Sequence, residues 1–176
     1  NIDFQGINLF AYIKNREVLA EEMKIANGTL SVFNDNSYPK SLKDKTGRFP
    51  HQLFQKIKLP ITIKKINLNK LDIGYAEFDK KSGQRGRINF SNTSGVITNV
   101  TNEYKYKKKD PIIEANLESY LMGQGKLNVG FKFNVLAPKA DFSYEGQLLN
   151  MDGRQLNYIT RPLAMVQIKS CLVRSL

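Results

Sequence analysis

The stretch Leu127-Asn128-Val129-Gly130-Phe131-Lys132-Phe133-Asn134-Val135 decides the fold. Its odd positions are all large and apolar, whereas its even positions are Asn, Gly, Lys and Asn. A period of two is typical of a β-strand that buries one face and exposes the other to solvent. At about 3.3 Å per residue, the stretch predicts a strand of roughly 30 Å.

The segments on either side alternate in the same way. One face of the preceding segment carries Ile113, Ala115, Leu117 and Leu121, and one face of the following segment carries Phe142, Tyr144, Gly146 and Leu148. The linker Gly123-Gln124-Gly125 is typical of a hairpin turn, and Pro138-Lys139 marks the second turn. The three segments therefore predict a meander of long antiparallel strands.

Further strands are expected along most of the chain, and these are 2–13, 23–33 through Asn27-Gly28, 61–63, 71–75, 88–90, 96–100 and 168–176. A break in the alternation near Lys64–Ile66 indicates a bulge or bend. Residues 79–86 form a polar turn, and the polar segment 34–49 is expected to be an irregular loop.

Helix is predicted only in short pieces. These are Arg16–Glu22, Pro50–Lys58 with Pro at the first turn, and a segment that Asp152 caps and Pro162 ends. The expected fold class is mainly β: a long antiparallel sheet, strongly curved or twisted, forming an open groove or a sandwich, with two or three short helices. We expect residues 1–176 to form a single domain. Both ends look cut, which indicates a fragment of a longer chain.

The chain carries 27 Lys and Arg against 16 Asp and Glu, a net charge of +11, and so attracts anionic partners. The densest basic run, adjacent to Tyr104 and Tyr106, gives the candidate contacts to an anionic surface: Lys105, Lys107, Lys108 and Lys109. The simplest interpretation of the charge is a solvated sheet face and a turn. A nucleic-acid interface is a less favoured alternative, because no RNA-binding aromatic strand motif accompanies the lysines.

Catalytic and metal-binding constellations are missing from the sequence. The single Cys171 lies in an apolar segment, where a free thiol is usually a small hydrophobe, and the single His51 is expected at the surface. The glycine pairs lie between strands, which does not favour a phosphate-cradling loop. No apolar run approaches the length of a membrane helix. We therefore predict a non-enzymatic protein without cofactor or metal.

Three segments resemble the AsmA-like and TamB-like family of Gram-negative cell-envelope proteins. They are Leu59-Pro60-Ile61-Thr62-Ile63 with its continuation to Leu68, Leu71-Asp72-Ile73-Gly74-Tyr75-Ala76-Glu77, and Gly86-Arg87-Ile88-Asn89-Phe90. The C-terminal pieces Tyr144-Glu145-Gly146 and Pro162-Leu163-Ala164 are similar to the end region of that family. Cys171 departs from the pattern, since glycine is expected there.

The resemblance implies a periplasmic protein, anchored to the inner membrane by a missing N-terminal helix, that shields phospholipid acyl chains in an apolar β-groove. It carries over no catalytic residue. The residues expected to line such a groove are Leu117, Leu127, Val129, Phe131, Phe133, Val135, Phe142 and Tyr144. The alternatives are an envelope assembly module with a closed core and no ligand, and the nucleic-acid-binding surface considered above.

Overall fold

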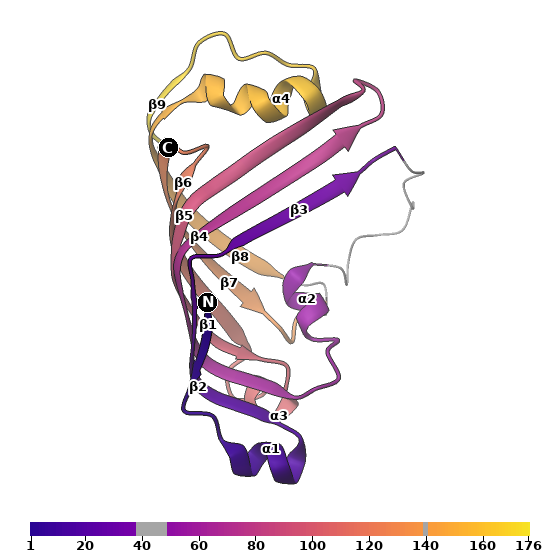
Figure 1. Cartoon of the computed structure of the whole chain (residues 1–176), viewed down its shortest axis with the longest axis vertical. Helices are drawn as coiled ribbons and strands as arrows, with labels where there is room; N and C mark the ends of the chain where they lie inside the picture. The colour runs from indigo at the N-terminus through magenta and orange to yellow at the C-terminus, as the bar shows by residue number, and fades with distance from the viewer. Residues whose placement is uncertain (38–48, 139–140) are drawn as a thin grey trace.

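The computed structural model describes residues 1–37, 49–138 and 141–176, and in these ranges nine strands form one open, mixed sheet (Figure 1). The prediction of a mainly β, strongly curved sheet is confirmed: 56% of the chain is strand, and the sheet is a single layer rather than a sandwich. Residues 38–48 of the expected loop, and Lys139 of the expected turn, lie outside the described residues.

The elements follow one another as β1 Ile2–Gln5, α1 Leu9–Asn15, β2 Val18–Ala26, β3 Thr29–Asp35, α2 Pro50–Phe54, β4 Ile61–Asp79, β5 Gln84–Thr101, α3 Tyr104–Lys107, β6 Ile112–Leu121, β7 Gly125–Asn134, β8 Phe142–Asp152, the 3-10 turn η1 Gly153–Leu156, α4 Asn157–Ala164 and β9 Leu172–Ser175. In the sheet the order is β1-β2-β4-β5-β6-β7-β8-β9, with β3 also pairing with β4. Figure 1 shows α1 and α4 at opposite ends of the bent sheet, with α2 inside the bend.

The predicted meander is confirmed as β6, β7 and β8, which pair antiparallel throughout. Phe131 lies opposite Ala115 on one side and Tyr144 on the other, and Phe133 lies opposite Ile113 on β6. Directly opposed residues share a face of the sheet, and alternate residues of one strand do too. The apolar positions of the three strands therefore lie on one face, as their alternation predicts.

The sheet, expected to be antiparallel, is mixed at β4. Both β2 and β3 run parallel to β4, β2 along Ile61–Asn69 and β3 along Asp72–Phe78. The two strands follow each other along one edge because Asn27 between them has a φ of +52°, a left-handed conformation that interrupts a strand and that Asn tolerates well. The chain returns through α2 before entering β4, as a parallel connection requires.

Left-handed residues also bend the two longest strands. The pieces predicted as separate strands join into the two long strands β4 and β5. Lys70 on β4 and Asn92 on β5 each have a φ of +53°, which bends the strand at that residue. The register shifts there, between Leu68 and Leu71 on β4, rather than at the predicted break near Lys64–Ile66. Beyond this line β3 and the outer halves of β4 and β5 leave the rest of the sheet as an arm (Figure 1). We define the arm as residues 29–35, 72–79 and 84–90.

The N-terminal predictions are wrong in two places. The expected strand 2–13 ends at Gln5, because the side-chain oxygen of Asn8 accepts a hydrogen bond of 2.9 Å from the Ala11 N–H and starts α1. Of the expected helix 16–22, Arg16 caps the end of α1 and residues 18–22 belong to β2. The pairing of β2 with β4 stabilises the strand more than the local sequence around Arg16 favours a helix.

The C-terminal helix follows its prediction more closely. Asp152 does act as a cap, since its carboxylate accepts the Arg154 N–H at 2.9 Å, but it caps the 3-10 turn that precedes α4. Pro162 lies inside α4 instead of ending it, and the helix ends at Ala164, followed by the left-handed cap Met165, whose φ is +56°. The expected strand 168–176 is shortened to β9, and the helix expected over 50–58 is shortened to α2.

Candidate functional site: an apolar inner face

The apolar alternation of β7 places Leu127, Val129, Phe131 and Phe133 on the face of the sheet that α2 approaches. The rings of Phe49 and His51, at the start of α2, lie against the rings of Phe142 and Phe133. In Figure 1 α2 occupies the inside of the bend, next to β7 and β8. We call this surface the inner face and define it by seven residues of the meander: Leu117, Leu127, Val129, Phe131, Phe133, Phe142 and Tyr144.

The structure brings these seven predicted residues together on one surface. The eighth, Val135, lies just beyond the end of β7, where its N–H donates to the carbonyl of Pro111 at 2.9 Å. None of the eight is buried: Phe142 is 45% exposed, Tyr144 is 71% exposed, and the others are half-buried. An apolar sheet face normally packs against a second layer, and no such layer covers this one in the described residues.

The aromatic side chains form a continuous cluster at one end of the inner face. The ring centroids of Phe131 and Phe133 are 5.6 Å apart, and that of Phe133 is 5.8 Å from Phe142. Tyr144 lies 6.2 Å from Phe131. Pairs at such separations contribute about 0.5–1.5 kcal/mol each beyond the area they bury. The cluster therefore holds its own shape while one side of its rings stays open.

Residues near α2 extend the cluster, and sequence reasoning missed them. The centroid of His51 is 4.9 Å from that of Phe133, and Phe49 is 6.3 Å from Phe142. The expectation that His51 is a surface residue is thus incorrect: it is half-buried against aromatic rings. The signal available was the Phe-Pro-His triplet, since Pro is favoured at the first position of a helix and marks where α2 begins. With five residues, α2 covers only one end of the face.

The opposite, outer face of the meander is polar. Lys132 Nζ lies 3.6 Å from Glu114 Oε1, and the two side chains are 61% and 42% exposed. Asn116, Gly130 and Glu145 surround a shallow depression there of about 170 Å³. The meander is thus amphipathic, with charges on the outer face and aliphatic and aromatic groups on the inner face.

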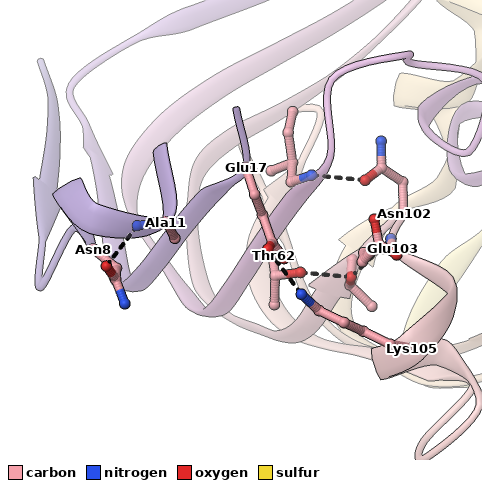
Figure 2. Close-up of polar contacts among 9 residues, drawn as sticks. Asn8, Ala11, Glu17, Thr62, Asn102, Glu103 and Lys105 are labelled. Atoms are coloured by element: carbon pink, nitrogen blue, oxygen red, sulfur yellow. Dashed lines mark hydrogen bonds and ion pairs between the residues drawn. The ribbon is translucent and has the colours of Figure 1, made fainter. Parts of the chain in front are cut away.

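A polar cluster closes the end of the sheet near α3 (Figure 2). Lys105 Nζ lies 2.8 Å from Oε2 of Glu17, whose side chain is only 4% exposed. The hydroxyls of Thr62 and Thr101 are 2.8 Å apart across β4 and β5. The side chain of Asn102 accepts from the Ile61 N–H and donates to two carbonyls of residues 57–59. These bonds tie the segment that follows α2 to the end of β5.

The lysine run therefore divides into two kinds of residue. Lys105 contacts Glu17, which raises the pKa of the Lys105 ammonium, and Lys107 donates to Oε1 of Gln55 at 2.9 Å. Lys108 and Lys109 are exposed, and neither forms an ion pair with a described residue. Of the four candidate contacts to an anionic surface, the structure leaves these two available.

The remaining candidate residues lie apart from the inner face. Cys171 is exposed in the segment before β9 and is not part of the apolar strand expected there. In the described part of the chain, no three His, Cys, Asp or Glu side chains are grouped so as to hold a metal ion. No helix in that part is both long and apolar enough to cross a bilayer.

Comparison with known proteins yields no relative: no family model, no curated protein and no solved structure matches this chain.

Proposed function

We propose that the protein is a non-enzymatic module of the bacterial cell envelope whose inner face binds the acyl chains of lipids. The observation that carries this proposal is the incomplete burial of Phe131 and Phe133. They belong to a long apolar face that neither a second sheet nor a helical layer covers in the described residues. Contiguous apolar surface that stays accessible to solvent is typical of a binding site in a soluble protein.

The shape and chemistry of the face suit an extended, flexible hydrocarbon. Leu117, Val129 and Leu127 continue the surface away from the aromatic cluster, so the apolar strip runs along and across the strands. Complete burial of a CH₂ group contributes about 0.8 kcal/mol. A chain that lies on an open face is covered on one side, so we expect roughly half of that contribution per CH₂.

The resemblance to AsmA-like proteins supports the same reading and suggests the setting. In that setting the module resides in the periplasm, is attached to the inner membrane through a region outside this chain, and takes part in envelope biogenesis or phospholipid transport between membranes. The positive net charge of +11 fits attraction to anionic membrane surfaces. A closed assembly module without ligand is the main competing function, and it requires another protein layer over the inner face.

The test is native mass spectrometry of protein purified from a bacterial membrane background. We expect bound phospholipid in the wild type and its loss in Phe131→Gln. The matched control is Lys132→Gln, one residue along β7 on the outer face, which should retain the lipid. A wild-type protein that carries no lipid and that detergent does not affect would overturn the proposal in favour of the assembly module.

A further inference from the structure

A second feature, far from the lysine run, is a depression of about 500 Å³ where α4 meets the arm. Three arginines line it, two from β5 and one from α4: Arg85, Arg87 and Arg161. The other lining residues are Gln84, Asn157, Tyr158 and Pro162. No carboxylate is among them. We call this feature the arginine depression.

The depression exists because β5 extends beyond the end of its neighbour β6. β6 pairs with β5 no further than Phe90, so residues 84–89 have no strand on that side, and α4 packs there instead. Gly86 makes the packing possible: a Cβ at this position would lie 2.7 Å from Cγ of Leu163. At the other end of the helix, the Asn157 side chain donates to the carbonyl of Ile168 at 2.8 Å and accepts its N–H at 2.7 Å. The helix that carries Arg161 is therefore fixed at both ends.

Aromatic rings orient two of the guanidinium groups. Arg87 lies over the Tyr158 ring at 4.8 Å from its centroid, and Arg85 lies over the Phe33 ring at 4.3 Å. A guanidinium group that stacks on a ring keeps its N–H donors free at the edge of its plane. The stacking thus reduces the freedom of both arginines without consuming their hydrogen-bonding capacity.

None of the residues that line the depression carries a negative charge. The residues directly opposite Arg87 and Arg85 on β4 are Ala76 and Phe78. Glu77 and Asp79 alternate with these two and so belong to the other face of the arm. None of the three arginines forms an ion pair with a residue in the described ranges.

One acid on the arm, Asp35, interacts electrostatically with Arg85. The Ser37 hydrogen bonds, and to a smaller extent the charge of Arg85, lower the pKa of Asp35, which lies beyond Phe78 on β3. Three guanidinium groups around one depression repel each other, and a bound anion would relieve this repulsion.

We propose that the arginine depression binds a phosphate group, either of a lipid headgroup or of soluble phosphate. Arginine donates paired N–H groups that match the spacing of phosphate oxygens, and charge-assisted bonds of this kind are roughly twice as strong as neutral ones. The site stands apart from the inner face: its residues come from β5 and α4, whereas the residues of the inner face lie on β6, β7 and β8. Loss of acyl-chain binding would leave this proposal intact.

The test compares two variants that each remove three positive charges. The first is Arg85→Gln/Arg87→Gln/Arg161→Gln. The second is Lys14→Gln/Lys58→Gln/Lys126→Gln, in which the substituted residues are exposed and lie on α1, after α2 and on β7. Binding is measured by flotation with phosphatidylcholine vesicles, with or without phosphatidic acid, and by titration calorimetry with inorganic phosphate and pyrophosphate. Urea unfolding of both variants verifies that they fold.

We expect the arginine variant to lose affinity by about tenfold or more, as the loss of several charge-assisted bonds implies, and the lysine variant to stay close to the wild type. If the selective loss occurs with phosphatidic acid vesicles only, the ligand is a headgroup. If it occurs with inorganic phosphate or pyrophosphate, the ligand is soluble. Equal losses in the two variants, or the absence of binding to every probe, would overturn the proposal. Tyr158→Leu keeps all three charges and should weaken binding less than the triple arginine substitution does.

Discussion

Lys105 Nζ forms an ion pair of 2.8 Å with Oε2 of Glu17, a residue 88 positions earlier in the chain. The glutamate is almost fully buried, whereas the lysine is half exposed. The pair joins the start of β2 to α3 and so connects the two sides of the sheet end shown in Figure 2. A lysine from the most basic run of the sequence thus stabilises the folded structure.

Removal of Lys105 should destabilise the protein because it leaves the buried Glu17 carboxylate without its cation. We expect Lys105→Met to lower the free energy of unfolding by roughly 1–3 kcal/mol, the cost of an unsatisfied buried group. The measurement is urea unfolding followed by circular dichroism. Lys108→Met, three residues along and exposed, is the control and should change stability by less than about 0.5 kcal/mol. Equal effects of the two substitutions would show that the ion pair is not stabilising.

Asn102 should control how firmly the segment carrying α2 is held near the inner face. Its side-chain NH₂ donates to the carbonyls of Ile57 and Leu59, both at 2.9 Å. Asn102→Asp replaces the two donors by an acceptor and sets a negative charge against two carbonyl oxygens. We expect faster amide hydrogen exchange in residues 50–58 and little change in β7. Unchanged exchange in α2 would contradict the proposed tethering.

Gly95 should be among the positions least tolerant of substitution. Its φ is +148°, and a Cβ there would lie 2.1 Å from the backbone oxygen of Asn116 on β6. Gly95→Ala therefore forces β5 and β6 apart, and we expect a loss of several kcal/mol, on the order of the larger single-residue effects. Gly83 is the control: its φ is +66° with no atom within 4 Å, so Gly83→Ala should cost only about 1 kcal/mol of backbone strain. Thermal or urea unfolding distinguishes the two cases.

The cap at Asp152 should give a small loss of stability in acid. Hydrogen bonds from the Arg154 side chain, and then from its backbone N–H, lower the pKa of the Asp152 carboxyl in the folded protein. A pKa lowered on folding means that the unfolded chain binds the proton more tightly. The contribution is therefore present above the ordinary value of about 4 and is lost as the pH falls below it. The difference in urea midpoint between wild type and Asp152→Asn should shrink between neutral pH and about pH 3. A constant difference would contradict the assignment.

The sequence predicted the meander well because its information is local. In β7 the apolar residues Leu127, Val129, Phe131 and Phe133 occur at every second position, which indicates that they share one side of the strand. This pattern can be recognised without knowing which strands pair with β7. The candidate inner face follows directly from that period. The contribution of His51 was missed because it depends on where α2 lies over β7, a contact between segments 80 residues apart.

The arginine depression was also beyond the reach of the sequence. Arg85 and Arg87 belong to a turn-adjacent strand, and Arg161 belongs to a helix more than 70 residues later. Their meeting depends on the unequal lengths of β5 and β6 and on the fit of Leu163 against Gly86. Nothing in the local pattern of either segment indicates this packing.

What the amino-acid sequence determined by itself is where the strands of the meander run and which of their side chains share a face, because backbone geometry alternates side chains regardless of the neighbouring strand. Only the tertiary structure decided that β2 and β3 run parallel along one edge of β4. It also decided that the left-handed residues Asn27, Lys70 and Asn92 lie along one line across the sheet, where the sheet bends. Strand partners are chosen by hydrogen-bonded register across long loops, and such long-range pairing is a property of the whole chain rather than of any segment.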